Sequence, residues 1–416
     1  MQRQNASRPP SVLPNPMYSI IGVNDLDVDD DMALEHNDTH REVIIVGSGP
    51  SGILSALKLR ELGINPLILE RNSCVAGNWS SRIPERYMTT PFSTLRIRKR
   101  DLHRRWITGS EYWRYLERVA TEEKLDIQLD WEVGLIKRGK NNWKIESPRG
   151  EVSCSVLIIA TGQDDKRRSP PKSDGTVRVV HSSEFAKQHH QLDNALVVGL
   201  GTSGADIAAV LAKKTGIVSV AHRSIPVILP KTILGLPVTK LGYLAHLFPD
   251  GAIDLVGDAI SAQAFGRLLW KHDAPRHRLS ERRTRRYAPV IDDGFVEQMV
   301  RGRIRLRPGL AELTNGQAVF EDGSSLKPSV VIDATGYEES YQRLFGNDTQ
   351  LDYQSISLAP ELFPKHCSTL FTVGIRQHTN VFASFVQSDA RRVAINVARQ
   401  LQTDSLSSIP KPSHFT

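Results

Sequence analysis

Cysteine is scarce in this chain of 416 residues, which contains only Cys74, Cys154 and Cys367. The three lie far apart, form no CxxC pair and are odd in number, so they make a poor disulfide framework. This usage favours a reducing compartment. The sequence also lacks the apolar core of a secretory signal and any run of about 18 apolar residues. We therefore expect a cytoplasmic protein without a transmembrane segment.

Motifs of nucleic-acid recognition are absent as well. No zinc-finger, RNA-recognition or basic-zipper pattern accompanies the net charge of +7, and the arginines are scattered. Such a basic surface is either simply solvated or favours anionic ligands such as dinucleotides. A hydrophobic content of 40% and a charged content of 24% are typical of a globular protein, so nucleic acid is not an expected partner, and no metal site is predicted.

The two ends of the chain differ from its middle. Residues 1–40 contain prolines that break early elements and then an acidic cluster from Asp25 to Asp31, a composition typical of a disordered tail. Residues 401–416 are polar, and we expect a second tail there. The length between the tails fits two domains.

A strand, a glycine-rich turn and a helix begin the middle part. Val43–Val46 is fully apolar, and residues 47–52 (GSGPSG) follow it directly. In such a turn Gly47 permits the sharp bend, Gly49 lets the backbone approach a pyrophosphate, and Gly52 allows close packing of the helix on the strand. The free N–H groups at the start of the helix would bind the phosphates.

Glu70 supplies the second half of this fingerprint. It ends the next apolar strand, Pro66–Leu69, about 18 positions after Gly52. An acidic residue at roughly 20 positions is the expected partner of the ribose hydroxyls. A glycine-rich turn without a ligand is the plainer alternative, but the complete strand–helix–strand context favours FAD or NAD at this site.

A second unit of the same kind begins at Ala195. Ala195–Val198 is an apolar strand, residues 199–204 (GLGTSG) form the turn, and Ile217–Ala221 is the next strand. That strand is followed by Arg223 and not by an acidic residue. Because an arginine pairs with a 2′-phosphate that a carboxylate would repel, this site suits NADPH. An ordinary surface charge is the alternative for Arg223.

Together these units predict an α/β fold with two Rossmann-type dinucleotide-binding domains, the NADPH domain being inserted into the FAD domain. Alternating apolar residues around Ile127–Trp131, Trp143–Ile145 and Val152–Ile159 predict an antiparallel β-meander that returns to the first sheet. Further strands are expected at Ile304–Leu306, Ala318–Phe320 and Val330–Ile332.

The domain limits follow from this order of elements. We assign residues 41–165 and 325–400 to the FAD domain and residues 166–324 to the NADPH domain. Residues from about 225 to 300 form an insertion within the NADPH domain. Its apolar stretches either line a substrate pocket or are ordinary domain helices. Its arginines at positions 282, 283, 285 and 286 either recognise a carboxylate or are solvated.

Two dinucleotide sites in one chain imply hydride transfer from a nicotinamide to a flavin. The ordered set of motifs resembles the flavin-containing monooxygenases, and its layout is similar to that of plant YUCCA-type enzymes. The motifs that carry this resemblance are the run from Val43 to Glu70, Gly77-Asn78-Trp79, Ile159–Gly162, Val197–Asp206 with Arg223, and Ile332–Tyr337. The two Ala-Thr-Gly turns at residues 160–162 and 334–336 mark, in that family, the points where strands pass between domains.

The resemblance implies an NADPH-dependent monooxygenase in which reduced FAD activates O₂ as a flavin hydroperoxide and transfers one oxygen atom to a small organic substrate. The oxygenated centre would be a nitrogen, a sulfur or the carbon of a 2-oxo acid. Because the cofactor carries the chemistry, no catalytic side chain is assigned. The residues expected to bind the two cofactors are Gly47, Gly49, Pro50, Ser51, Gly52, Glu70, Arg71, Gly77, Asn78, Trp79, Thr161, Gly162, Gly199, Gly201, Thr202, Ser203, Gly204, Arg223, Ser224, Thr335 and Gly336.

The resemblance is incomplete in the segment that links the domains. His181 and Phe185 match the end of the family's linker signature, but Gly175 and Val177 stand where phenylalanine and glycine are expected. Phe185 in place of tryptophan points away from Baeyer–Villiger enzymes. The alternatives are an NADPH oxidase or reductase that oxygenates no substrate, and a Baeyer–Villiger or N-hydroxylating monooxygenase. A flavin disulfide reductase would need a cysteine pair, which the sequence does not offer locally.

Overall fold

A computed structural model describes residues 40–80, 86–162, 166–188, 194–241, 248–266, 274–283, 288–338, 341–346, 369–375 and 382–407 of the chain. Thr39–Thr416 forms one unit by its internal contacts. The expected tail of residues 1–40 lies outside the described residues except for His40, which begins the first strand. The expected tail of residues 401–416 is helical in its first part, because helix α11 (Phe382–Ser407) extends to Ser407.

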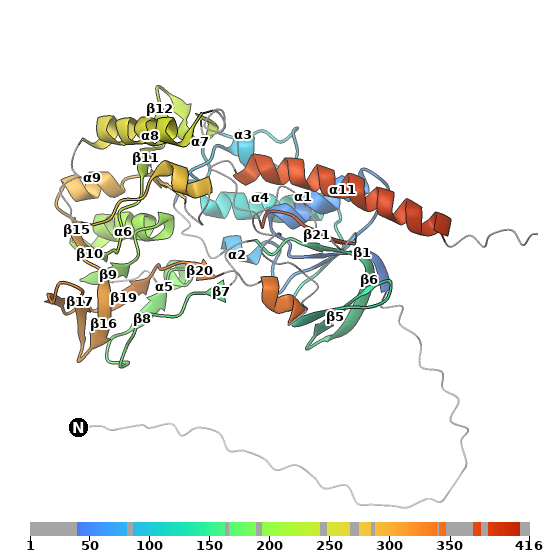
Figure 1. The fold of residues 1–416 in the computed structure, drawn as a ribbon, viewed down its shortest axis with the longest axis horizontal. Coiled ribbons are helices and arrows are strands. Elements are labelled where there is room, and N and C mark those ends of the chain that lie inside the picture. The colour runs from blue at the N-terminus through green and yellow to red at the C-terminus, as the bar shows by residue number, and fades with distance from the viewer. Residues whose placement is uncertain are drawn as a thin grey trace, which may run out of the picture. The chain divides into compact units, whose positions relative to one another are not determined.

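The first sheet is built around the amino-terminal strand (Figure 1). Its strands run in the order β3 (Ile127–Gln128), β2 (Leu67–Leu69), β1 (His40–Val46), β6 (Gly150–Ile159), β5 (Trp143–Ser147) and β4 (Leu135–Arg138), and β21 (Leu370–Thr372) also pairs with β6. The strands β4, β5 and β6 form the antiparallel meander. Ile127–Gln128, which the alternation assigned to that meander, is instead a parallel neighbour of β2.

Helices cover this sheet because their apolar residues lie on matching faces. Helix α1 (Pro50–Arg60) packs between the sheet and α11, where Leu54 and Leu59 share a core with Val393. Helix α4 (Gly109–Glu122) buries Tyr112, Tyr115, Leu116 and Val119, which is the spacing of one helix face. Short helices α2 (Gly77–Ser80) and α3 (Phe92–Leu95) complete this part.

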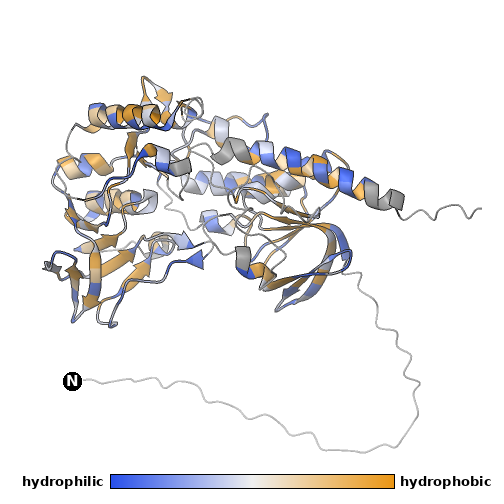
Figure 2. Cartoon of the chain, in the orientation of Figure 1, coloured by the Kyte–Doolittle hydropathy of each residue, from blue (hydrophilic) through white to orange (hydrophobic). Residues whose placement is uncertain are grey.

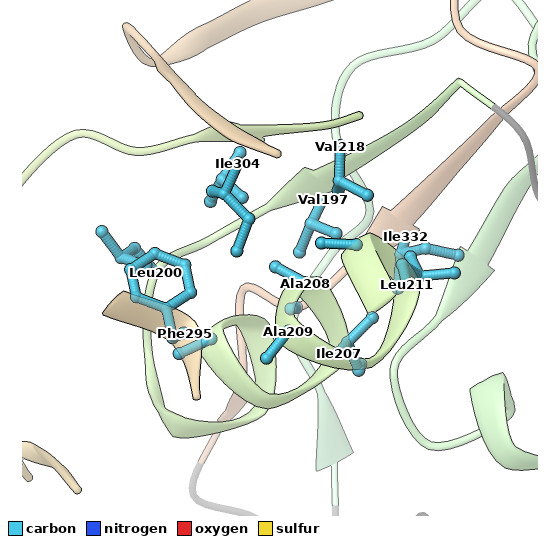
Figure 3. Close-up of a cluster of buried hydrophobic side chains, with 14 of the residues drawn as sticks. Val197, Leu200, Ile207, Ala208, Ala209, Leu211, Val218, Phe295, Ile304 and Ile332 are labelled. Carbon is cyan, nitrogen blue, oxygen red and sulfur yellow. The ribbon is translucent and has the colours of Figure 1, made fainter. Parts of the chain in front are cut away.

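The second sheet is entirely parallel and lies between β6 and β21 in chain order, so it is an insertion into the first domain. Its strands run in the order β15 (Ile304–Arg307), β10 (Val218–Ala221), β9 (Ala195–Val198), β19 (Val330–Asp333) and β8 (Val179–His181). Val197, Ile332 and Val218 pack against Ile207 and Leu211 of helix α6 (Thr202–Thr215), as Figure 3 shows. Strands buried on both faces explain the continuous apolar runs.

Strand β19 lies in the second sheet, whereas the sequence interpretation placed its residues in the first domain. Residues from 325 onward were grouped with the first domain, yet Val330–Asp333 pairs with β9 and β8 in the second sheet. The return to the first sheet begins later, with β21. Between the two, β20 (Tyr337–Glu338) pairs antiparallel with β7 (Lys166–Arg167), so the two segments that follow the Ala-Thr-Gly turns run side by side.

The insertion after β10 has its own small core. Strand β11 (Ile228–Pro230) pairs with β14 (Val290–Asp292), and helix α8 (Asp250–Phe265) packs on β11 and on the 3₁₀ helix η3 (Leu279–Arg283). Helix α8 is largely apolar, as Figure 2 shows. Of the arginine cluster, positions 285 and 286 lie outside the described residues, and only the backbone of Arg282 and Arg283 is described.

The remaining elements are short. They are α5 (Phe185–Gln188), the hairpin β12 (Thr232–Ile233) and β13 (Leu236–Pro237), α7 (Val238–Leu241), α9 (Phe295–Val300), the three-stranded sheet β16 (Leu310–Thr314), β17 (Gln317–Phe320) and β18 (Ser325–Leu326), and η4 (Tyr341–Phe345). Within the described ranges, no helix is long and apolar enough to cross a bilayer.

Candidate functional site

The two glycine-rich turns have the same backbone geometry. Gly47 has φ +103° and Gly199 has φ +105°, a region that side chains larger than hydrogen rarely adopt. A Cβ atom on Gly47 would lie 2.7 Å from the carbonyl oxygen of Ala160, and one on Gly199 would lie 2.5 Å from that of Ala334. Each turn therefore rests on the Ala-Thr-Gly turn that follows the neighbouring strand.

The third glycines serve packing, and the second ones leave open space. A Cβ on Gly52 or Gly204 would lie 1.9 Å from the carbonyl oxygen of the first glycine in its own turn. A Cβ on Gly49 or Gly201 would meet nothing within 4 Å. Both of these second glycines are helix N-caps without a side-chain cap, so the space before the first N–H groups of α1 and α6 suits an anion.

The first turn opens into a pocket of about 310 Å³. Many of the predicted residues line it, namely Gly47, Gly49, Pro50, Ser51, Glu70, Arg71, Gly77, Asn78, Trp79, Thr161 and Gly162. Gly52 does not line the pocket because it lies against Gly47. The pocket wall also contains Asn72, Trp131, Glu132 and Arg343, which sequence reasoning missed. Asn72 lies two residues after Glu70, whereas Trp131, Glu132 and Arg343 come from a loop and a short helix that carry no motif.

Glu70 lies in the pocket wall, but its carboxylate already accepts four hydrogen bonds. Oε2 accepts from the backbone N–H of Ser48 at 2.9 Å and from the Ser48 hydroxyl at 2.5 Å. Oε1 accepts from the backbone N–H of Asn72 at 3.0 Å and from its side-chain amide at 2.6 Å. Since a carboxylate has about four lone-pair sites, a ribose hydroxyl would have to replace one of these donors.

The bonds to Glu70 also explain why position 77 is a glycine. A Cβ on Gly77 would lie 2.4 to 2.6 Å from side-chain atoms of Asn72, so this glycine makes room for the side chain that holds Glu70. Trp79 packs edge-on against Tyr112 at 4.8 Å between ring centroids and also lines the pocket. Packing and pocket lining are therefore both roles of Trp79.

Thr161 offers the pocket a polar group without a protein partner. Its Oγ1 is buried and has no hydrogen-bond partner among the described residues. A buried hydroxyl in this condition is rare, and it fits a polar ligand atom. Together with the open N-terminus of α1, this makes the pocket suitable for a dinucleotide.

The second turn opens into a pocket of about 690 Å³. The predicted residues that line it are Gly199, Gly201, Thr202, Ser203, Arg223, Ser224, Thr335 and Gly336. Gly204 is again the packing glycine. Arg223 is exposed, and none of the residues in the described part forms an ion pair with it. The pocket also contains His277 from the insertion, which sequence reasoning missed.

A third pocket of about 650 Å³ is lined by residues of both domains. Asn78 and Trp79 come from the first domain, and Thr202 and Ser203 from the second. Tyr337, which follows the second Ala-Thr-Gly turn, lines it as well. Residues of the two domains therefore meet in one space, as transfer between two bound rings requires.

Ion pairs join the two domains beside this third pocket. The Arg86 guanidinium, 12% exposed, pairs with Asp206 of α6 and lies 3.6 Å from the carboxylate of Asp293. Lys231 Nζ lies 3.4 Å from the same Asp293 and 4.7 Å from the ring centroid of Trp106. Burial lowers the pKa of Lys231, and Asp293 opposes this shift. No sequence motif pointed to Arg86 or Lys231 as neighbours.

His181 of the linker packs edge-on against Tyr337, with 5.2 Å between the ring centroids, and burial lowers the pKa of His181.

The described cysteines form no disulfide. Cys74 and Cys154 are both free, and Cys367 lies outside the described residues. Burial raises the pKa of Cys154 to about 12. Among the described residues there is thus no cysteine pair of the kind that a flavin disulfide reductase needs.

Comparisons with known proteins agree with this geometry. A family model described as flavin-binding monooxygenase-like matches residues 159–410, and one described as pyridine nucleotide-disulphide oxidoreductase matches residues 44–229. The probable indole-3-pyruvate monooxygenase YUCCA8 of Arabidopsis thaliana is 26% identical over 71% of this chain and 75% of its own length. The probable indole-3-pyruvate monooxygenase YUCCA3 of the same plant is 27% identical over 87% of each chain.

Solved structures share the fold at lower identity. A cyclohexanone monooxygenase bound to epsilon-caprolactone matches with a TM-score of 0.67 and 18% identity, covering 88% of each chain. A flavin-containing monooxygenase from Stenotrophomonas maltophilia matches with a TM-score of 0.60 and 15% identity, covering 87% of this chain and 99% of its own.

Proposed function

The chain belongs to the flavin-binding monooxygenase-like family and uses FAD and NADPH, and we propose that the first pocket holds FAD, the second holds NADPH and the third is where the substrate is oxygenated. The observation that carries this proposal is the third pocket, because Asn78 and Trp79 of the first domain line it together with Thr202 and Ser203 of the second glycine-rich turn. When bound, the reduced flavin supplies the electrons that activate O₂.

The first pocket supports FAD through three features of this chain. The N-terminus of α1 would bind the pyrophosphate across the open face of Gly49. Glu70 would bind the ribose by exchanging the amide of Asn72 or the hydroxyl of Ser48 for a ribose hydroxyl. Thr161 Oγ1 would give its free hydrogen-bonding capacity to the cofactor.

The second pocket supports NADPH over NADH through charge. The N-terminus of α6 and the open face of Gly201 repeat the pyrophosphate site of the first pocket. The position after β10 carries Arg223, which is exposed at the pocket and has no competing ion pair with a described residue. A guanidinium there would bind the 2′-phosphate with two parallel hydrogen bonds.

The surroundings of the third pocket would position the reactants and limit access of water. Trp79 and Tyr337 contribute aromatic walls from the two domains. Arg86, fixed by Asp206, would keep the domains in register so that the nicotinamide reaches the flavin. These walls would exclude water from the reacting atoms.

We propose a 2-oxo acid as the first candidate substrate. The Arabidopsis relatives are named as probable indole-3-pyruvate monooxygenases, and three arginines line the third pocket, namely Arg71, Arg86 and Arg167. Arg167 pairs with Glu184 and Arg71 donates to Asn78 at 3.2 Å. A substrate carboxylate would join or replace these partners, as arginine forks readily bind carboxylates.

The experiment follows NADPH oxidation, O₂ consumption and product mass with the purified yellow protein. We expect extracted flavin to be FAD, NADPH oxidation to accelerate with indole-3-pyruvate, and one atom from ¹⁸O₂ to enter the product. Peroxide release in place of an oxygenated product would identify an oxidase. The absence of both bound flavin and NADPH oxidation would reject the proposed function as a whole.

A further inference from the structure

Three polar side chains form a chain of hydrogen bonds at the rim of the second pocket. The Ser224 hydroxyl oxygen lies 2.9 Å from His277 Nε2, and His277 Nδ1 lies 2.8 Å from Glu281 Oε2. Ser224 directly follows Arg223, and both line the pocket together with His277. Glu281 does not line the pocket, and Ser224 adjoins Arg223, the residue proposed to bind the 2′-phosphate.

The backbone fixes this arrangement although Ser224 and His277 are far apart in sequence. The N–H of Ile225 donates to Pro275 at 2.8 Å, and the N–H of His277 donates back to Ile225 at 3.0 Å. These two bonds form a short parallel bridge between the segment after β10 and the insertion. The imidazole is therefore held beside Ser224 by local pairing.

Glu281 is held in turn by its own segment. Its Oε1 accepts from the backbone N–H of Arg278 at 3.0 Å, which leaves Oε2 for the histidine. The same segment is anchored to α8, because Ser280 donates to Asp254 through its N–H at 2.7 Å and its hydroxyl at 2.8 Å. Two elements of the insertion thus support the orientation of one imidazole.

The chemistry of this chain suits a phosphate. A carboxylate at Nδ1 makes that nitrogen a donor, so Nε2 faces Ser224. A Ser224 oxygen that accepts from Nε2–H keeps its own proton free to donate to a phosphate oxygen. Arg223 would supply a charged fork and Ser224 a further hydrogen-bond donor, which together suit the oxygens of a phosphate monoester.

We infer that Ser224, His277 and Glu281 form a specificity-determining group for the 2′-phosphate of NADPH, with Glu281 as a positioning residue. This inference rests on the proposed NADPH site. It goes further because it assigns a role in cofactor choice to the insertion, which contributes His277 and Glu281 from outside the glycine-rich unit.

The test measures binding of 2′-AMP and 5′-AMP to the full-length protein by calorimetry, so that no turnover is needed. We expect His277→Ala to weaken 2′-AMP binding about tenfold, because a Ser224 hydroxyl without its Nε2 partner is no longer held to donate to the charged phosphate. Binding of 5′-AMP should change less than about twofold, which also shows that the pocket is folded. Glu281→Gln should weaken 2′-AMP binding by a smaller factor.

Arg278→Ala is the matched control. Arg278 is exposed, lies next to His277 and does not line the pocket, so its truncation alters the same segment without removing a side chain of the hydrogen-bonded chain. Equal effects of Arg278→Ala and His277→Ala would overturn the inference, as would equal loss of both nucleotides in His277→Ala. Ester hydrolysis that disappears in Ser224→Ala would also overturn it, since serine, histidine and a carboxylate form the same chain in hydrolases.

A different set of results would reject the proposed NADPH site itself. If the unmodified protein bound neither nucleotide, or bound 2′-AMP no more tightly than 5′-AMP, the assignment of NADPH to this pocket would itself be wrong. If the unmodified protein preferred 2′-AMP and the His277→Ala variant showed the same preference, the NADPH site would stand and the inference about His277 would fall.

Discussion

Replacing Gly201 or Gly204 of the second turn with alanine tests two different roles. The first role is the approach of the cofactor to the backbone, and the second is the packing of the turn. Gly201 has an ordinary backbone conformation and open space in front of it, whereas a Cβ on Gly204 would lie 1.9 Å from the carbonyl oxygen of Gly199. Gly201→Ala should therefore fold and lose NADPH. Gly204→Ala should be destabilised, because the atom in its way belongs to the backbone.

The magnitudes follow from the geometry. A Cβ needs about 3 Å from an oxygen, so Gly204→Ala forces a shift of about 1 Å in the turn. Overpacking of this kind lowers the free energy of unfolding by about 1–3 kcal/mol. Because the obstructing atom belongs to the backbone and cannot move aside easily, we expect a loss near the upper end of that range. The gain in helix propensity is at most about 1 kcal/mol and does not offset this. At Gly201, alanine in an N-cap costs about 1 kcal/mol or less.

The assay is thermal unfolding combined with binding of NADPH. We expect Gly204→Ala to lower the melting temperature by about 4–8 °C and Gly201→Ala by less than about 4 °C, with NADPH binding at least about tenfold weaker in Gly201→Ala. Tight NADPH binding by Gly201→Ala would refute the role given to the open face. Loss of flavin from a Gly201 variant, but not from the matching Gly49 variant, would reverse the two cofactor assignments.

Three further predictions concern single side chains. Arg223→Ala should raise the KM for NADPH about tenfold or more and the KM for NADH by less than about twofold, since only NADPH has the 2′-phosphate; equal effects in steady-state assays would contradict the assignment. Glu111→Gln keeps the capping box with Thr108 but removes the negative charge that faces the N-terminus of α4 and pairs with Arg104, so it should destabilise α4 by about 0.3–1 kcal/mol. Hydrogen bonds from Arg104 and Thr108 lower the pKa of Glu111 from 4.5 to about 2, so its stabilising effect is complete above pH 4.5 and is lost as the pH falls toward 2; the difference in melting temperature between variant and parent should narrow over that window. Because burial raises the pKa of Cys154 to about 12, its thiol should stay protonated at about pH 8 and resist a thiol reagent until the protein unfolds, which mass spectrometry of the labelled peptide would check.

The glycine-rich turns could be predicted residue by residue because each role is local. The positive φ of Gly47 and the close approach of Gly52 to Gly47 depend on atoms within the same few residues or on the adjacent strand. The neighbourhood of Glu70 was predicted only in part. Its position after the strand follows from the motif, but the four bonds that Ser48 and Asn72 donate depend on side-chain rotamers.

Long-range partners had no signal in the sequence. Val330–Ile332 is apolar and buried, a pattern that suits any central parallel strand, so nothing in it distinguished the second sheet from the first. His277 reaches the second pocket through a backbone bridge to Ile225, and no periodicity announces such a bridge. Both depend on tertiary pairing and not on local pattern.

The departures from the family's linker signature concern packing and not the pockets. Val177 is 6% exposed and belongs to the core shared with Leu196 and Phe320, and Phe185 is 1% exposed in the core beneath α6. Gly175 has φ +84°, a conformation that favours glycine. None of these three residues lines the pockets described above. Whether oxygen reaches a substrate or leaves as peroxide should therefore depend on the residues of the third pocket, and replacing Val177 should change stability before it changes the ratio of product to peroxide.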